Sequence, residues 1–104
     1  MFKITKAAAE QIMDSAEQAD QDGTPLRIAA RKTDDGSIEY TMGFDAHREG
    51  DTQVVSEKID IIFDEGTKGL LQGAVMDFVE YEPGDFRFIF MNPNDPHFVP
   101  PEDA

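Results

Sequence analysis

Cysteine is missing from this 104-residue sequence, and its absence excludes several kinds of chemistry. Without thiols the chain can form no disulfide, carry out no thiolate catalysis and offer no cysteine ligand to zinc or to an iron–sulfur centre. Tryptophan is also missing, whereas phenylalanine occurs 8 times. We therefore expect a hydrophobic core built partly on phenylalanine.

Basic residues are scarce, with 9 lysines and arginines against 22 aspartates and glutamates, and the formal net charge is −13. Proteins that bind nucleic acids need a basic surface that neutralises phosphates, and anionic membranes attract basic segments. We therefore expect neither nucleic acid nor a membrane as a partner. Basic proteins or cations would be attracted, although the simplest interpretation is that the charge keeps the protein soluble.

No apolar run is long enough to cross a bilayer, and the N-terminal "MFKITKAAAE" has no apolar stretch followed by a signal cleavage site. A cytoplasmic location is therefore expected. The length suits one compact domain. We place that domain at residues 1–94, followed by an extended, acidic and proline-rich tail at residues 95–104 that should be loosely ordered.

Helical periodicity begins directly after Thr5, whose hydroxyl can accept a hydrogen bond from the first turn as an N-cap. The apolar stripe of this predicted helix consists of Ala9, Ile12, Met13, Ala16 and Ala19. Gly23 is suited to the turn that follows. A second, short helix is predicted within "EGTKGLLQG", residues 65–73.

Alternating apolar residues predict a β-hairpin of residues 26–33 and 37–44, closed by the turn sequence "TDDG". Further strands are predicted at residues 53–56, 59–63, 74–81 and 85–91. The last of these is apolar on both faces, so it should lie between two layers. The charged loop of residues 45–51 should be exposed. The predicted fold class is α+β, with sandwich-like mixed sheets of about seven strands, one long N-terminal helix and one short internal helix.

A search for catalytic motifs finds none. His47 and His97 belong to no paired-histidine zinc motif, and no serine lies in a G-x-S-x-G sequence. Asp34 and Asp35 form no acid–base pair without a substrate cleft, and turn propensity explains both. We therefore predict no catalytic, cofactor-binding or metal-binding residues and interpret the chain as non-enzymatic.

Four strings of the sequence carry a resemblance to a known family. "ITKAAAEQI" (residues 4–12) is similar to I-T-x-x-A-A-x-x-I, and residues 26–44 align with L-R-L-x-V-x-x-x-G-C-S-G-x-x-Y-x-L-x-F. "MDFVEY" (residues 76–81) and "FRFIFMNPN" (residues 86–94) resemble L-D-[FY]-V and F-x-F-x-N-P-N. In this order, over nearly the whole chain, they resemble the A-type iron–sulfur carriers, the HesB/IscA-like family.

The resemblance implies the fold of that family and also shows what this chain has lost. Family members use three cysteines to bind iron or an iron–sulfur cluster, usually between subunits. The first falls on Asp35, and the other two fall on or near Val99 and Pro101. None of these side chains supplies a thiolate. Within the family, the chain looks most like the cysteine-less, DsrR-like branch that accompanies dissimilatory sulfur oxidation.

Two functions remain open at this stage. The first is a regulatory module, without iron, cluster or other cofactor, that binds a protein partner of unknown identity. Its candidate contact residues are Asp34, Asp35, His97 and Phe98. Because no cluster bridges subunits and acidic surfaces repel one another, we expect a monomer.

The second function is a carrier of iron or another hard cation. Its oxygen ligands would come from Asp34, Asp35 and Glu39, with His97 as a further donor. The missing soft ligands weigh against this function, because iron–sulfur clusters are held mainly by thiolates.

Overall fold

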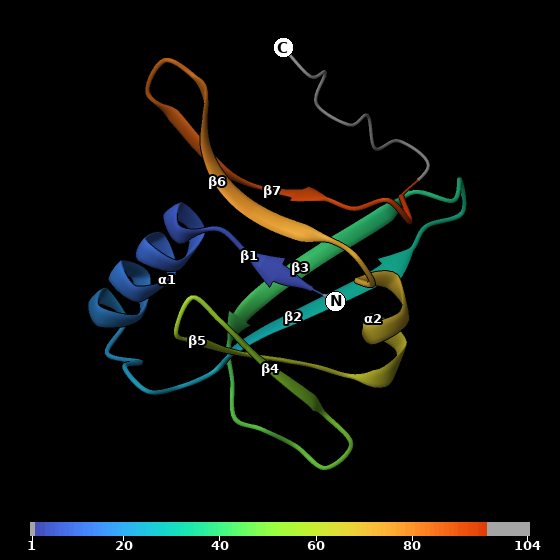
Figure 1. Ribbon diagram of the computed structural model, residues 1–104, viewed down its shortest axis with the longest axis horizontal. Helices are drawn as coiled ribbons and strands as arrows, with labels where there is room; N and C mark the ends of the chain where they lie inside the picture. The colour runs from blue at the N-terminus through green and yellow to red at the C-terminus, as the bar shows by residue number, and fades with distance from the viewer. Residues whose placement is uncertain (1, 96–104) are drawn as a thin grey trace.

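Two mixed β-sheets and two helices build the molecule, and the computed structural model describes residues 2–95 (Figure 1). The three-stranded sheet has the order β1 (Lys3–Ile4), β6 (Val75–Glu82), β7 (Asp85–Met91). The four-stranded sheet has the order β3 (Ile38–Phe44), β2 (Leu26–Lys32), β5 (Ile59–Phe63), β4 (Thr52–Ser56). The helices are α1 (Lys6–Gln18) and α2 (Glu65–Leu70). The α+β class and the predicted hairpin of residues 26–33 and 37–44 are confirmed, since β2 pairs with β3 in antiparallel register.

Two parallel pairings give the sheets their mixed character. β2 pairs with β5, and the two-residue β1 pairs with β6. β1 was not predicted, since two residues are too few to show an alternating pattern. Long-range backbone bonds fix it in place: the N–H of Lys3 donates to the carbonyl of Ala74 at 3.1 Å, and that of Thr5 to Met76 at 3.0 Å.

Helix α1 begins as predicted, because the Thr5 hydroxyl accepts a hydrogen bond from the backbone N–H of Ala8 at 3.2 Å. Its buried face consists of Ala8, Ala9, Ile12 and Ala16. Two members of the predicted stripe are not buried. Ala19 is the exposed C-cap, and Met13 is 45% exposed because it lies on the flank of the helix rather than on its packed face.

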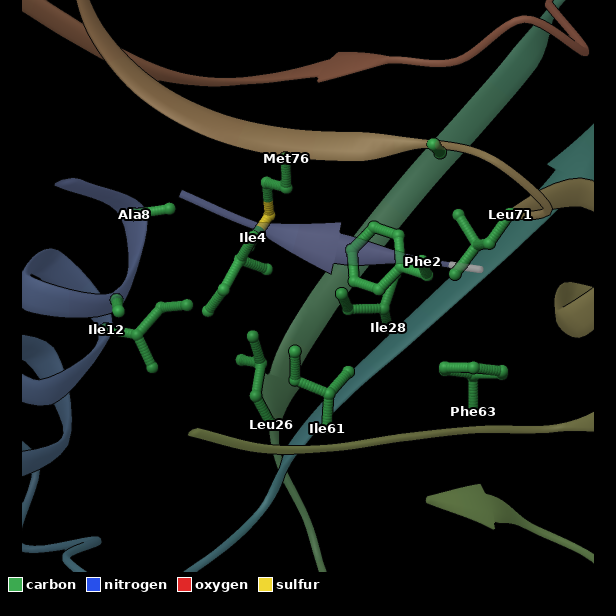
Figure 2. Close-up of a cluster of buried hydrophobic side chains, with 12 residues drawn as sticks. Phe2, Ile4, Ala8, Ile12, Leu26, Ile28, Ile61, Phe63, Leu71 and Met76 are labelled. Carbon is green, nitrogen blue, oxygen red and sulfur yellow. The ribbon is translucent and has the colours of Figure 1, made fainter. Parts of the chain in front are cut away.

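The hydrophobic core lies between the two sheets and is closed on one side by α1 (Figure 2). Ile28, Ile61 and Met76 are completely buried in it. Each such side chain contributes about 1.5–3 kcal/mol relative to an exposed one. Phenylalanine contributes as expected: Phe2 and Phe63 are buried, and the Phe2 and Phe90 rings stack with centroids 6.4 Å apart.

Strand β7 was expected between two layers, and this prediction is wrong for its first half. β7 lies at the edge of its sheet, and Phe86 is 56% exposed. The β6–β7 hairpin projects beyond the rest of the molecule, so the end near its turn has no opposing layer (Figure 1).

The charged loop of residues 45–51 was expected to be exposed, but Asp51 is not. Its side chain is only 5% exposed, because the guanidinium of Arg27 binds both of its carboxylate oxygens. Arg27 also donates to Asp45 at 2.8 Å. These hydrogen bonds from Arg27 lower the pKa of both carboxyls, and the backbone N–H of Arg48 lowers that of Asp51 further.

Candidate functional site

The turn between β2 and β3 is a three-residue loop, Asp34, Asp35 and Gly36. The backbone N–H of Gly36 donates to the carbonyl of Thr33 at 3.0 Å, and the N–H of Thr33 donates to the carbonyl of Ser37 at 2.9 Å. Gly36 has a φ of 87°, a conformation that glycine adopts without strain. The turn predicted from "TDDG" is therefore confirmed.

The carboxylate of Asp35 takes part in this turn. Its Oδ1 accepts a hydrogen bond from the backbone N–H of Ser37 at 3.0 Å and lies 2.6 Å from the Ser37 hydroxyl. The hydroxyl of Thr33 is within hydrogen-bonding distance of the same oxygen. An aspartate that binds the backbone two residues on stabilises a tight turn. A cation at Oδ1 would have to compete with these donors.

The other acidic residues proposed as metal ligands do not gather around Asp35. Asp34 is exposed at the tip of the loop, and Glu39 forms an ion pair with Arg31 at 2.8 Å. Within residues 2–95 no three histidine, aspartate or glutamate side chains come together as a metal site. His97, Phe98, Val99 and Pro101 lie outside the described residues.

The N-P-N sequence has a structural role that the sequence did not reveal. Asn92 is completely buried, and its side-chain amide donates to the carbonyl of Leu70 at 2.7 Å and to the Tyr40 hydroxyl at 3.0 Å. Its Oδ1 accepts from the backbone N–H of Asn94 at 2.9 Å. These bonds join the end of β7 to α2 and to β3.

Tyr40 connects Asn92 to the β2–β3 hairpin. Its ring stacks on Phe90 with centroids 3.9 Å apart, and burial raises the pKa of its hydroxyl. The described chain therefore ends at Asp95 beside the start of β3, on the side of the molecule that carries the Asp35 turn (Figure 1). A pairing of Tyr40 with the N-P-N sequence has no local sequence signal, since 52 residues separate Tyr40 from Asn92.

The described residues thus offer a hairpin tip with exposed carboxylates, joined to the body of the molecule through Tyr40 and Asn92, but no assembled set of metal ligands. No helix within residues 2–95 is long and apolar enough to cross a membrane.

No family model matches the sequence, but individual known proteins are similar to it. The chain is 32% identical over 96 residues to the iron-sulfur cluster insertion protein ErpA of Proteus mirabilis, a match that covers 89% of this chain and 82% of the relative. It is 29% identical over 92 residues to ErpA of Alkalilimnicola ehrlichii, covering 88% and 75% of the two chains.

Solved structures share the fold. The crystal structure of IscA with its [2Fe-2S] cluster matches with a TM-score of 0.69 at 23% identity, covering 89% of this chain and 83% of that one. SufA of Escherichia coli matches with a TM-score of 0.70 at 21% identity, covering 89% and 86%. A protein of Aquifex aeolicus matches with a TM-score of 0.68 at 28% identity, covering 88% and 91%.

Proposed function

The chain belongs to the A-type iron–sulfur carrier family, and from this premise we propose that it is a cluster-free member that acts as a protein-binding, regulatory module. Its relatives include cluster insertion proteins, yet the chain has no cysteine. By the resemblance, the family's turn thiolate falls on Asp35, and its two tail thiolates fall on or near Val99 and Pro101. Valine and proline side chains have no donor atom, and aspartate offers a hard oxygen where a cluster needs soft sulfur.

The observation that carries this proposal is the binding of the Asp35 carboxylate within its own turn. Oδ1 of Asp35 accepts from the backbone of Ser37 and lies close to the hydroxyls of Thr33 and Ser37. Aspartate at this position therefore stabilises the hairpin. This role explains why the residue is present without any metal.

The proposed contact surface for a protein partner comprises the hairpin tip, with Asp34 and Asp35, and the tail, with His97 and Phe98. The position of Asp95 beside the start of β3 supports this grouping, because the tail starts on the side of the molecule that carries the tip. In the same proposal, residues 1–94 form the domain and residues 95–104 form the tail. The chain works as a cytoplasmic monomer without enzymatic activity, in a process linked to sulfur oxidation, as in the DsrR-like branch.

Anaerobic reconstitution with ferrous iron and sulfide tests the cluster-free state. After desalting, the wild-type chain should have no visible chromophore and no bound iron. The matched control is Asp35→Cys/Val99→Cys/Pro101→Cys, which places sulfur at or near the three family positions and should gain colour and iron. A stoichiometric chromophore on the wild-type chain would overturn the proposal.

Affinity capture from the native cell extract tests the binding role of the tail. The full chain and a chain ending at Asn94 serve as baits in parallel. Loss of a specific partner from the shorter bait is the expected result. An identical set of partners would remove the tail from the contact surface.

A further inference from the structure

A groove separate from the Asp35 turn lies between α1 and the turn that joins β4 to β5. It consists of two cavities of about 340 and 360 Å³ that share Met13 and Lys58 as lining residues. Figure 1 shows the β4–β5 turn next to α1. We call this feature the α1 groove.

The floor of the α1 groove is apolar. Ile12 and Ala16 contribute from α1, and Leu26, Phe44 and Ile59 contribute from the strands. Met13 is common to both cavities and is 45% exposed. A methionine at such a position can adapt its flexible side chain to apolar groups of different shape.

The rim of the α1 groove is acidic, because its carboxylates outnumber its ammonium groups. Five carboxylates line the two cavities against the two ammonium groups of Lys6 and Lys58: Glu10, Glu17, Asp22, Glu57 and Asp60. The chain's four arginines, Arg27, Arg31, Arg48 and Arg87, all pair with carboxylates elsewhere. In the part of the chain that the structure describes, no rim carboxylate forms an ion pair.

The β4–β5 turn presents two of these charged side chains at a conformational cost. Glu57 and Lys58 have φ angles of 49° and 68°, in the left-handed region. Two-residue hairpin turns of this kind favour Asn-Gly, and an ordinary residue costs about 1 kcal/mol or more at such a φ. The strained pair lies where both side chains line the groove.

We propose that the α1 groove binds a basic segment of a partner protein, whose apolar anchor contacts Met13 and whose lysines or arginines pair with the rim carboxylates. The inference rests on the proposed function as a protein-binding module, and it gives that module a second surface. Complementary charge speeds encounter and fixes orientation, and burial of the apolar anchor adds affinity.

Binding of defined peptides, followed by NMR on the ¹⁵N-labelled full chain at physiological salt, tests the inference. The probe is a synthetic lysine- and arginine-rich peptide with one leucine. Its comparators replace the leucine by serine or the basic residues by glutamate. The basic peptide should give saturable shifts in α1 and at residues 57–60, without matching shifts at residues 33–37, and both comparators should bind more weakly.

Two variants with equal net charge separate the groove from the acidic surface as a whole. Glu10→Gln/Glu17→Gln/Asp60→Asn neutralises three rim carboxylates, and Glu49→Gln/Glu65→Gln/Glu82→Gln neutralises three exposed carboxylates outside both the groove and the hairpin tip. The rim variant should lose about tenfold in affinity, as expected for three modest ion pairs. The control variant should change affinity less than about twofold, because screening limits the effect of distant charges.

Equal losses in the two variants, shifts centred on residues 33–37, or no saturable binding would overturn the groove as a docking site. None of these outcomes depends on the presence of a cluster. Reconstitution of the wild-type chain therefore decides the cluster-free state independently, and either proposal can fail while the other stands.

Discussion

The β2–β3 and β4–β5 turns both contain residues at positive φ, but residues of different types occupy these positions. The first has a glycine at its positive φ and an aspartate whose oxygen binds the turn itself. The second places two charged, non-glycine residues at positive φ. The aspartate of the first turn thus stabilises its own loop, whereas the second turn, which lines a groove, keeps two residues at strained angles. Strain of this kind points towards a function at the second turn.

The largest effect is expected where the first turn is joined to the body of the molecule. Asn92→Ala removes a buried amide that binds Leu70 and Tyr40, and it should lower the free energy of unfolding by about 2–4 kcal/mol. Urea denaturation measures the loss. The more exposed Asn94→Ala serves as the control and should lose less. Equal losses would show that burial of Asn92 adds nothing.

Relief of strain in the second turn should give the next largest change, and in the opposite direction. Glu57→Asn/Lys58→Gly introduces the residues that this turn favours and should raise the free energy of unfolding by about 1–2 kcal/mol. Urea denaturation measures this gain in the free energy of unfolding, and Lys58→Gly alone should give part of it. A destabilised double variant would contradict the contrast between the two turns.

A smaller change is expected at Asp35. Asp35→Ala removes the acceptor for the Ser37 N–H and should cost about 1 kcal/mol. Asp35→Asn keeps an oxygen acceptor and should cost less. Thermal denaturation of both variants in parallel checks this order. An asparagine variant as unstable as the alanine variant would show that charge, rather than turn geometry, explains the aspartate.

Acid should weaken the ion pairs that Arg27 forms with Asp45 and Asp51 in the loop after β3. Arg27 lowers the pKa of Asp51 and Asp45 in the folded state, so their pairing stabilises the fold above the pKa of an unfolded aspartate, about 3.9. That contribution is lost as the pH falls further. The stability difference between the wild type and Arg27→Met should therefore be constant near neutral pH and shrink in acid. Urea midpoints across this range measure it, and a pH-independent difference would speak against the ion pairs.

Local sequence patterns were sufficient to predict the main elements and the tight turn at "TDDG". They failed where the outcome depends on distant neighbours. Met13 continues the apolar pattern of α1 but lies on its flank, and Asp51 is charged yet covered by Arg27, 24 residues earlier. No periodicity could show either, because partners distant in the sequence decide both.

The candidate site, too, could be predicted from the sequence only in part. The absence of cysteine was visible in the sequence, because it concerns the identity of single residues. The α1 groove could not be predicted from the sequence, since Glu10 and Glu57, which are distant in the chain, line the same cavity only after folding. The buried role of Asn92 was hidden for the same reason: its partners lie 22 and 52 residues away.

Equilibrium dialysis of the wild-type chain against ferrous iron, under anaerobic conditions and without sulfide, tests most directly whether the carboxylates of the β2–β3 turn bind iron. Asp34→Asn/Asp35→Asn is the matched variant, since it keeps oxygen acceptors in the turn. We expect only weak iron binding that does not saturate and is the same for both chains. Stoichiometric iron on the wild-type chain that disappears in the variant would show that the turn is a metal site after all.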